Sequence, residues 1–489
     1  MGKFAIIDIG SNTVRLVVYE NRERAPYVVF NEKVFCGLGR GVAETGNMID
    51  EAMELAEKTL KRFSMLIVKM GIDDPRIIAT SAVRDAKNGS EFVERIKDYT
   101  GLSIEVIKGT EEARLSANGV ICAVPHASGV MADLGGGSLE LATIKDRNVN
   151  NECTLPIGPL RLQDQEGKWF DNPKRMVKKN LAEINWLSEN KGQKFYAVGG
   201  AWRSLARIHM DMIDYPHINM HNYIIPVNEI MSLAKKVSKM SLVEVYQYRG
   251  LISEKRAKII SLASLTLYHL LKNLKSSKFV VSGFGVREGV LYDGMSDEVR
   301  TQDPLIVGCH QVAEMTGRFP EHGQRLYNWI DPLFDNESDE QKRLRLAICI
   351  LSDVGWRGHP EYRADKVVGE VLYGRFGGIN HWGVGLISMA LYTCYGGSRQ
   401  YSDQVEVAAS LINKYDLDYA RKIGMALRLA QRLSAGTERG LKIAKLDVNE
   451  DTLLLRINRE KKDITNDVVI KRLESLARSF DLDPKVTHK

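Results

Sequence analysis

The feature that most constrains the fold of this chain is a motif that occurs twice, over residues 4–18 and 130–144. Each copy is an apolar strand that ends in an aspartate (Asp8, Asp133), then a short turn of Gly, Ser or Asn, then a second apolar strand. Glycine has no Cβ, so backbone N–H groups in such a turn can converge on an anion. Two such hairpins that face each other would clamp a phosphate chain from both sides.

Strand and helix patterns alternate after the first copy, which predicts a partly parallel sheet with crossover helices. Asp50 is a good N-cap for the first long helix. We expect strands at 4–9, 14–19, 27–35, 76–79 and 103–107, and helices near 50–70, at 89–99 and from about 111.

The second copy opens another α/β unit that extends to about residue 305. We expect a helix at 173–190, a strand at 195–198, a long helical stretch at 227–273 and a strand at 278–282. Two units that open with the same hairpin predict an internally duplicated fold with a cleft between the halves. The alternative is that the two hairpins arose independently as structural turns.

The pattern changes beyond Asp303-Pro304, where most segments have a helical period. The last residues return to strand-like alternation at 451–458 and to a helix near 466–480. The sequence therefore predicts four domains. They are residues 1–128 and 129–305, both α/β, then a helical domain over 306–435 and a small α/β domain over 436–489.

Composition indicates an ordinary globular chain, with 44% hydrophobic and 27% charged residues among 489. No apolar run is long enough to span a bilayer, and the first strand begins too early to leave room for a signal peptide. The six cysteines are scattered without C-x-x-C spacing, which predicts reduced thiols and a cytoplasmic location.

The net charge of +6 is small, but basic residues cluster at 174–179, 255–258 and 272–278, which suits a polyanionic partner. The sequence contains no zinc-finger spacing and no aromatic–basic recognition strand, so we predict no specific nucleic-acid partner.

The doubled hairpin resembles the phosphate hairpins of the actin-like ATPase superfamily, whose domains are ribonuclease H-like. Within it, the chain is similar over its whole length to the exopolyphosphatase/guanosine pentaphosphate phosphatase (Ppx/GppA) family. The segments that carry this resemblance are 8–12, 38–42, 80–84, 109–115, 133–138 with Glu140, and 282–291. Asp-x-Gly-Gly-Gly-Ser alone is a weak signal, but joined to Glu-Glu-Ala-Arg in this order it is specific.

A phosphate cradle is the first element of the site that the sequence predicts. Backbone and hydroxyl donors of both turns would bind phosphate. The Gly199-Gly200 turn, which follows the strand at 195–198, would open a helix N-terminus toward the same phosphate. A guanidinium at Arg84 suits bidentate phosphate contact, although an ion pair with Asp85 is the simpler alternative. The predicted phosphate-binding residues are Ser11, Asn12, Arg84, Gly135, Gly136, Gly137, Ser138, Gly199 and Gly200.

A divalent cation is the second element. Asp8 and Asp133 end apolar strands, where an uncompensated carboxylate is costly, and Mg²⁺ (or Mn²⁺) beside them would explain their position. An Asx-turn in each hairpin is the alternative. Glu140 faces the same side of its strand as Ser138 and would reach the metal or its waters. K⁺ is an optional further ion.

A base for the attacking water is the third element. Glu112 follows a strand and lies in the first turn of a helix, where the helix dipole also favours an ordinary carboxylate. The resemblance implies that Glu112, the second glutamate of Glu-Glu-Ala-Arg, is the catalytic base. Glu111 would be a solvated or capping residue.

Two segments of the first three hundred residues depart from the family pattern. Trp202 follows Gly199-Gly200, where small or hydroxyl residues are usual, and would narrow the cleft. The basic run 255–261 replaces an expected Asp and a Gly-rich continuation.

The helical domain resembles a His-Asp metal phosphohydrolase domain that has degenerated. Ser352 precedes Asp353 where a histidine ligand is usual, and Tyr395 stands where a later histidine is expected. Loss of imidazole ligands predicts no second activity. We expect His359 to be structural or to line a substrate channel. The domain would extend a basic track for a long polyanion and form a homodimer interface.

The sequence therefore predicts an exopolyphosphatase that removes terminal phosphates processively from inorganic polyphosphate. The same kind of site also fits the 5′-phosphate of guanosine pentaphosphate, with guanosine tetraphosphate as product. A nucleotide-gated binding protein of the actin type is the alternative from another class.

Overall fold

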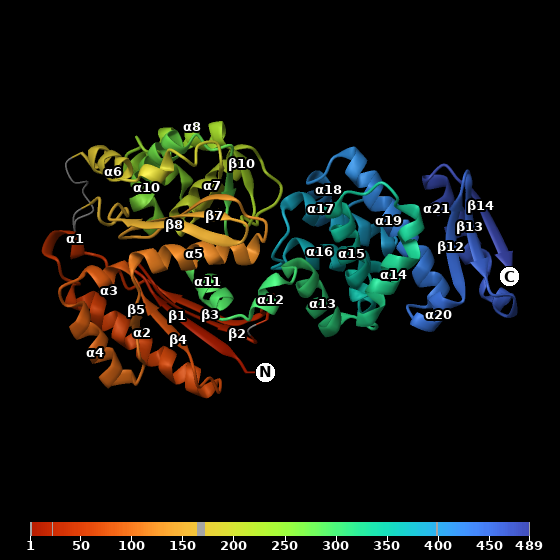
Figure 1. Ribbon diagram of the computed structural model, residues 1–489, viewed down its shortest axis with the longest axis horizontal. Helices are drawn as coiled ribbons and strands as arrows, with labels where there is room; N and C mark the ends of the chain where they lie inside the picture. The colour runs from red at the N-terminus through yellow and green to blue at the C-terminus, as the bar shows by residue number, and fades with distance from the viewer. Residues whose placement is uncertain (1, 22, 164–171, 398–399, 489) are drawn as a thin grey trace. The chain divides into compact units, whose positions relative to one another are not determined.

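The computed structural model describes residues 2–21, 23–163, 172–397 and 400–488. The chain divides into two compact units, Met1–Gln302 and Asp303–Lys489 (Figure 1). The division lies slightly before the predicted boundary at 305. The inner boundaries at 128 and 435 stay predictions.

Unit 1 contains two β-sheets of the same design. The first has the order β3-β2-β1-β4-β5, in which β2 pairs antiparallel with β3 and β1, and β4 pairs parallel with β1 and β5. Its strands are β1 (Phe4–Ile9), β2 (Val14–Tyr19), β3 (Val28–Val34), β4 (Arg76–Ala79) and β5 (Glu105–Val106).

The second sheet repeats that order as β8-β7-β6-β9-β11, with the same succession of antiparallel and parallel pairs and an added antiparallel edge strand, β10. The predicted duplication is therefore confirmed. The strands are β6 (Gly129–Leu134), β7 (Leu139–Lys145), β8 (Asn148–Leu155), β9 (Lys194–Val198), β10 (Ile224–Pro226) and β11 (Lys278–Val281).

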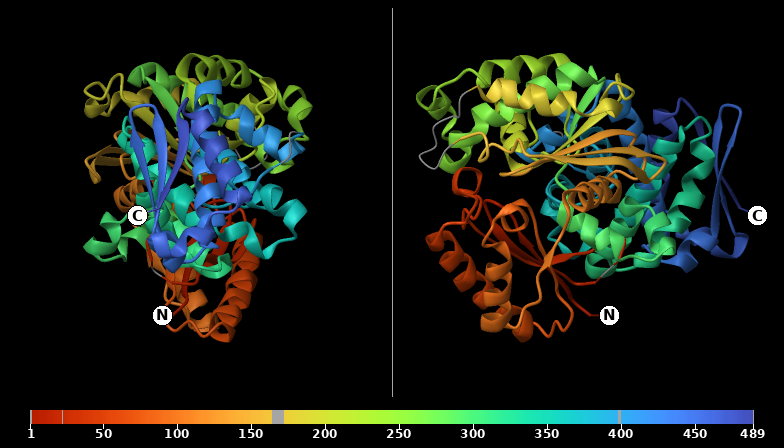
Figure 2. Two further views of the ribbon diagram at one scale, coloured as in Figure 1. Left: turned by 90° about the vertical axis from the view of Figure 1, so that its right-hand side faces the viewer. Right: turned by 60° about the vertical axis from the view of Figure 1, so that its left-hand side comes forward.

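Helices cover the outer faces of both sheets and fill the space between them (Figures 1 and 2). Phe63 of α2 and Phe92 of α4 pack on the first sheet, and Leu205 of α7 and Leu267 of α10 pack on the second. The helices of unit 1 are α1 (Val42–Thr45), α2 (Asp50–Lys69), α3 (Ser81–Asp85), α4 (Gly89–Thr100), α5 (Gly109–Ala123), α6 (Pro173–Ala182), α7 (Gly200–Met212), α8 (Val227–Val237), α9 (Leu242–Val245), α10 (Glu254–Leu274), α11 (Val286–Asp293) and α12 (Asp297–Thr301).

Helices α5 and α11 lie between the two sheets and share one apolar core with both. Two glycines let these helices cross in direct contact. A Cβ on Gly289 would lie 1.7 Å from the carbonyl oxygen of Leu115, and a Cβ on Gly119 would lie 2.1 Å from that of Gly285. No larger residue fits at either position without displacing backbone. The crossing therefore fixes the face of α5 that carries Glu112.

Some predicted boundaries in unit 1 are wrong. The stretch 227–273 is three helices, because Ser241 and Glu244 form a capping box that starts α9 and a 3₁₀ turn then separates it from α10. The helix predicted at 173–190 ends at Ala182, and a short 3₁₀ turn, Asn185–Leu187, follows. The strand predicted at 103–107 is reduced to Glu105–Val106.

Unit 2 is helical and ends in a small mixed sheet, as predicted. One apolar core joins its helices to the sheet, whose order is β12-β13-β14. The elements are α13 (Pro304–Thr316), α14 (Gly323–Ile330), α15 (Asp339–Leu351), α16 (Arg363–Leu372), α17 (His381–Cys394), α18 (Asp403–Ser410), α19 (Lys414–Ser434), α20 (Glu438–Lys442), β12 (Ala444–Asn449), β13 (Thr452–Ile457), α21 (Asp467–Ser479) and β14 (Asp483–His488).

In the part of the chain that the structure describes, no helix is both long and apolar enough to cross a membrane. The six cysteines are free thiols.

Candidate active site

The turns of the two hairpins have the same backbone geometry. The N–H of Gly10 donates to the carbonyl of Thr13 at 2.9 Å, and the N–H of Gly135 donates to that of Ser138 at 3.0 Å. The two turns connect β1 to β2 and β6 to β7, which occupy matching places in the duplicated sheets. The duplication therefore extends to the local turn.

The tips of the two turns meet. A Cβ on Gly137 would lie 2.9 Å from the hydroxyl oxygen of Ser81 and 3.1 Å from that of Ser11, and these two hydroxyls hydrogen-bond to each other at 2.8 Å. A Cβ on Gly136 would lie 3.2 Å from the Cβ of Ser11. The structure thus brings the predicted cradle residues of both copies together around Ser11.

Neighbouring loops hold each turn by its carbonyl groups. The N–H of Gly39 donates to the carbonyl of Ser11 at 2.7 Å, and the N–H of Leu160 donates to that of Gly136 at 2.8 Å. The N–H of Gly37 donates to the carbonyl of Asn12 at 3.2 Å, and the Asn12 side chain is half-buried. These loops fix the orientation of both turns.

Glu112 lies on α5 and is 8% exposed. Nη1 of Arg84 donates to its Oε2 at 3.0 Å. Burial raises the pKa of Glu112 well above its ordinary value, Glu140 raises it further, and Arg84 opposes both. Its neighbour Glu111 is partly exposed and instead pairs with Arg114 at 2.7 Å.

Glu140 and Asp133 are cross-strand neighbours on β7 and β6. Glu140 is 1% exposed, and burial raises its pKa to about 8, against the nearby hydroxyls of Ser138 and Thr154, of which Thr154 donates to Oε1 at 3.0 Å. The Ser116 hydroxyl donates to Oδ2 of Asp133 at 2.7 Å, while burial raises the pKa of Asp133. Ser116 lies one turn after Glu112, so one face of α5 reaches both the base candidate and Asp133. Sequence reasoning missed Ser116 and Thr154.

The donor chemistry of Asp133 and Glu140 fits a divalent cation. Within the described part of the chain, both accept hydrogen bonds from hydroxyl groups and from no arginine or lysine. Mg²⁺ takes one or two carboxylates and completes its shell with waters and substrate phosphate oxygens. Among the described residues, no group of three or more His, Cys, Asp or Glu side chains is placed to hold a metal alone.

Asp8 has a different environment from Asp133. Its Oδ2 accepts from Nη1 of Arg287 at 2.8 Å, so an arginine already offsets its charge. Its cross-strand neighbour is Arg15, at the position that Glu140 occupies in the second copy. The duplicated hairpins therefore carry opposite charges at equivalent positions.

Arg15 belongs to a group of five cations in unit 1 that we call the basic cluster. Its members come from β2, β3, α7, α10 and α11, and are Arg15, Lys33, Arg203, Arg256 and Arg287. Burial and neighbouring guanidinium groups lower the pKa of Arg15 and that of Arg256 to about 10. Such crowding of like charges stabilises a bound polyanion. Sequence reasoning noted Arg15, Arg203, Arg256 and Arg287 only within separate segments and did not group them, because five separate elements build the cluster.

The Gly199-Gly200 turn places the start of α7 beside the second hairpin. Gly199 has φ +104°, and a Cβ there would lie 2.6 Å from the carbonyl oxygen of Leu134, so only glycine fits. A Cβ on Gly200 would lie 2.2 Å from Nη2 of Arg256, which therefore packs against the helix start. The expectation that Trp202 narrows the cleft is wrong. It is fully buried, and its ring N–H donates to the carbonyl of Ala263.

Arg84 forms the ion pair with Asp85 that the sequence offered as the simpler alternative, and it also pairs with Glu112, while its contact with phosphate stays a prediction. Its Nε donates to Asp85 at 3.1 Å while its Nη1 donates to Glu112. Arg161, in the loop after β8, pairs with the other oxygen of Asp85 at 2.6 Å. This Arg161–Asp85–Arg84–Glu112 chain ties the second half of unit 1 to the first.

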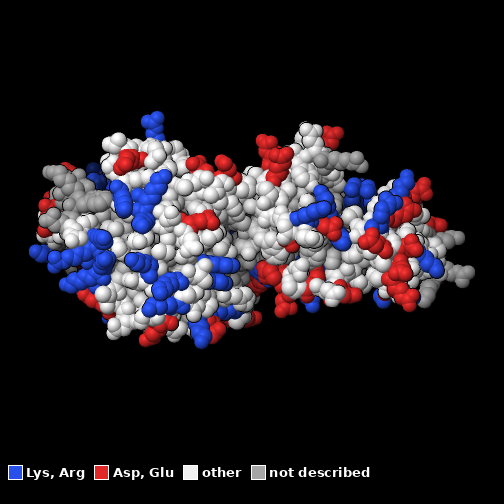
Figure 3. Space-filling view, turned by 90° about the horizontal axis from the view of Figure 1, so that it is seen from above, with Lys and Arg blue, Asp and Glu red and all other residues white. Residues whose placement is uncertain are grey.

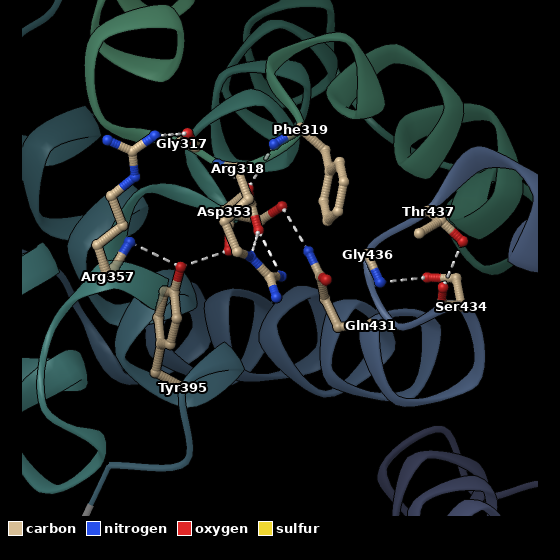
Figure 4. Close-up of polar contacts among 12 residues, drawn as sticks. Gly317, Arg318, Phe319, Asp353, Arg357, Tyr395, Gln431, Ser434, Gly436 and Thr437 are labelled. Atoms are coloured by element: carbon tan, nitrogen blue, oxygen red, sulfur yellow. Dashed lines mark hydrogen bonds and ion pairs between the residues drawn. The ribbon is translucent and has the colours of Figure 1, made fainter.

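The His-Asp-like segment of unit 2 has its own polar network (Figure 4). Asp353 is 3% exposed and accepts from Nε and Nη2 of Arg318 and from the backbone N–H of Phe319. The Tyr395 hydroxyl donates to the Ser352 carbonyl at 2.7 Å. The Arg318 guanidinium therefore hydrogen-bonds to the Asp353 carboxylate, which a metal ion at this position would need as a ligand. His359 caps a short 3₁₀ turn through its ring nitrogen.

Comparison with known proteins identifies the family. The model of the Ppx/GppA phosphatase family matches residues 17–298, and that of the exopolyphosphatase C-terminal family matches residues 305–481. The chain belongs to the Ppx/GppA phosphatase family. The predicted family and the predicted phosphatase class are therefore confirmed.

Three relatives of this Ppx/GppA chain illustrate the similarity. Exopolyphosphatase 1 of Mycobacterium leprae is 24% identical over 60% of the chain and 90% of its own length. The bifunctional 3-dehydroquinate synthase/phosphatase of Fusobacterium nucleatum is 27% identical over 60% of the chain, a match that covers 47% of that protein. The crystal structure of an exopolyphosphatase from Cytophaga hutchinsonii is 26% identical, with a TM-score of 0.54 over 60% of this chain and 99% of that one.

Removing the Arg84 cation should make the stability of unit 1 depend more steeply on pH. The folded-state pKa of Glu112 lies above its unfolded value, so the folded state retains a proton that the unfolded state releases, and stability falls as pH rises through that window. Arg84→Met should raise this pKa further. It should lower the free energy of unfolding by about 2–4 kcal/mol at pH 8, and by less at pH 5.

Urea unfolding at both pH values measures the effect. Arg161→Met is the matched control, because Arg84 still pairs with Asp85, and it should cost less than about 1 kcal/mol. Equal pH slopes for the wild type and Arg84→Met would contradict the buried Glu112–Arg84 pairing.

Proposed function

We propose that this Ppx/GppA phosphatase is an exopolyphosphatase that releases orthophosphate processively from the end of inorganic polyphosphate. The observation that carries the proposal is the position of Glu112. It is buried, its pKa is raised, and it shares its surroundings with Glu140 and Asp133 next to the paired glycine turns. The names of the Mycobacterium and Cytophaga relatives support the same activity.

In this mechanism the terminal phosphate lies beside the contact of the two turns, where backbone N–H groups and the hydroxyls of Ser11 and Ser138 donate to its oxygens. Water attacks the terminal phosphorus, the P–O bond to the rest of the chain breaks, and the shortened chain leaves as the anion. Glu112 accepts the proton of the attacking water and later releases it to solvent. Its raised pKa makes the carboxylate a stronger base than an exposed glutamate.

Asp133 and Glu140 would hold Mg²⁺ (or Mn²⁺) together with substrate phosphate oxygens, with Asp8 contributing only if it exchanges its Arg287 partner. When bound, the cation would offset the negative charge of the phosphate oxygens and the nearby carboxylates. Arg84 keeps Glu112 in place until substrate arrives, and then offers a cation to the phosphate. K⁺ is an optional further ion in this proposal.

The basic cluster gives the rest of the substrate a path away from the reacting phosphate. Polyphosphate carries charge along its whole length, so it can use several cations that lie beyond the turns. Guanosine pentaphosphate is the alternative substrate within the same family, and a nucleotide-gated binding protein of the actin type is the alternative from another class.

We assign unit 2 no second hydrolytic activity, because Arg318 already neutralises Asp353 and Ser352 stands where a histidine ligand would be needed. From the sequence we further propose that unit 2 extends the basic track and forms a homodimer interface. We also propose a cytoplasmic location for the protein.

Replacing the base tests the reaction. Glu112→Gln should lower phosphate release from polyphosphate by about 10²–10⁴-fold, because the amide cannot accept the proton of water. Glu111→Gln is the matched control and should retain activity, since its carboxylate pairs with Arg114 on the solvent side. The assay compares polyphosphate, guanosine pentaphosphate and ATP, with circular dichroism as a check of folding.

Polyphosphate should be the best of the three substrates. Preference for guanosine pentaphosphate would select the alternative phosphatase, and slow turnover of ATP alone would select the actin-type binding protein. Near-normal turnover by a folded Glu112→Gln variant would exclude Glu112 as the base.

A second prediction concerns the basic cluster. Arg256→Gln should raise KM for long polyphosphate by about tenfold, change kcat little, and weaken the salt dependence of KM, since one ionic contact is lost. Lys258→Gln is the control, because this lysine lies on the same helix, is exposed and pairs with Glu254. Equal KM values for the two variants would remove the cluster from the substrate path.

A further inference from the structure

A groove on the outer surface of unit 1 lies apart from the paired turns. It has a volume of about 680 Å³ and is bounded by α6, the segment 184–191 and the C-terminal half of α10. We call it the α6–α10 groove. Its volume is within the usual range for sites that bind small organic molecules, roughly 300–1,000 Å³. The function proposed above does not use it.

His269 of α10 is the buried polar group of this groove. The residue is 7% exposed and lines the groove, and its ring meets Tyr268 edge-on. Within the part of the chain that the structure describes, His269 makes no hydrogen bond. Its ring nitrogens are not fully enclosed, so water or a ligand in the groove can supply the hydrogen bonds that the protein does not.

Lysines from three different segments surround this histidine. Lys178 of α6, Lys191 of the following loop and Lys272 of α10 line the groove, and Glu189 is the carboxylate that lines it with them. In the described part of the chain, these three lysines form no ion pair. A lysine in the last turn of a helix compensates the helix dipole, which accounts for Lys272 but not for Lys191.

The charges act on His269 directly. Burial lowers its pKa, and so do Lys178, Lys174 and Lys272, so the positive field of these lysines disfavours the charged imidazole. On the face of unit 1 that Figure 3 draws, Lys and Arg side chains outnumber Asp and Glu side chains. An anion in the groove would offset this field.

The floor of the groove is apolar. Leu181 and Leu187 are buried beneath it, with Ile184 partly exposed between them. A fully hydrated inorganic ion would leave this surface unused, whereas an organic molecule that carries a phosphate can cover it.

We propose that the α6–α10 groove binds an organic phosphate of nucleotide size, with the phosphate among Lys178, Lys191 and Lys272 and the organic part on the apolar floor. His269 donates a hydrogen bond to the phosphate and gains a proton on binding. This site is independent of the proposed exopolyphosphatase activity, because none of its residues takes part in that reaction.

The test uses the full-length protein with ¹³C at Cε1 of histidine, and assigns the His269 resonance with His269→Gln. Adenosine 5′-monophosphate is the probe, since it has no phosphoanhydride bond to hydrolyse. It should shift the His269 resonance saturably and raise the pKa of that histidine. Adenosine should cause no shift, and orthophosphate should bind at least about tenfold more weakly than the nucleotide.

Two pairs of lysine substitutions give the contrast. Lys178→Ala with Lys272→Ala should raise Kd by at least about tenfold, because two charge-assisted contacts are lost. Lys235→Ala with Lys236→Ala, on exposed positions of α8, removes the same charge and should leave Kd within about twofold. The proposal would be overturned if adenosine 5′-monophosphate caused no shift of the His269 resonance, or if adenosine caused an equal shift. It would also be overturned if orthophosphate bound as tightly as the nucleotide, or if Lys178→Ala with Lys272→Ala left Kd unchanged.

Discussion

The site depends on the close approach of two glycine turns. A Cβ on Gly137 would lie 2.9 Å from the hydroxyl oxygen of Ser81, and a Cβ on Gly136 would lie 3.2 Å from the Cβ of Ser11, so a side chain at either position would push these neighbours away. The approach is possible because the halves of unit 1 share one core around α5 and α11, which themselves cross through Gly119 and Gly289. Glycine at four positions therefore sets the spacing of the halves, and the position of Glu112 on α5 follows from it.

Unit 1 buries a group of carboxyl groups in one place and a group of guanidinium groups in another, which folding stability alone would not favour. Around Glu112, Glu140 and Asp133, burial raises each carboxyl pKa, while around Arg15 and Arg256 burial lowers the pKa of the guanidinium groups. Both groups would be more stable in water. Such perturbed groups gather where a ligand is bound, and a phosphate chain with a divalent cation complements both at once. The two hairpins differ in charge at one equivalent position, which is Arg15 in the first hairpin and Glu140 in the second.

Local patterns allowed much of this to be predicted. The repeated strand–turn–strand motif predicted the duplication, and alternation along β7 placed Glu140 beside Ser138. Other features depend on contacts between distant segments. The Arg287–Asp8 pair joins α11 to β1, Trp202 belongs to the core because Ala263 accepts its ring N–H, and the basic cluster needs five elements at once. Nothing near these residues in the sequence indicates their partners.

The central claim is that both turns hold one phosphate. A crystal structure of the Glu112→Gln variant soaked with tungstate, a phosphate mimic visible by anomalous scattering, tests it most directly. We predict one strong peak within hydrogen-bond distance of Ser11 and of the backbone at Gly136–Ser138. A peak confined to the basic cluster, or bound to one turn alone, would contradict the account.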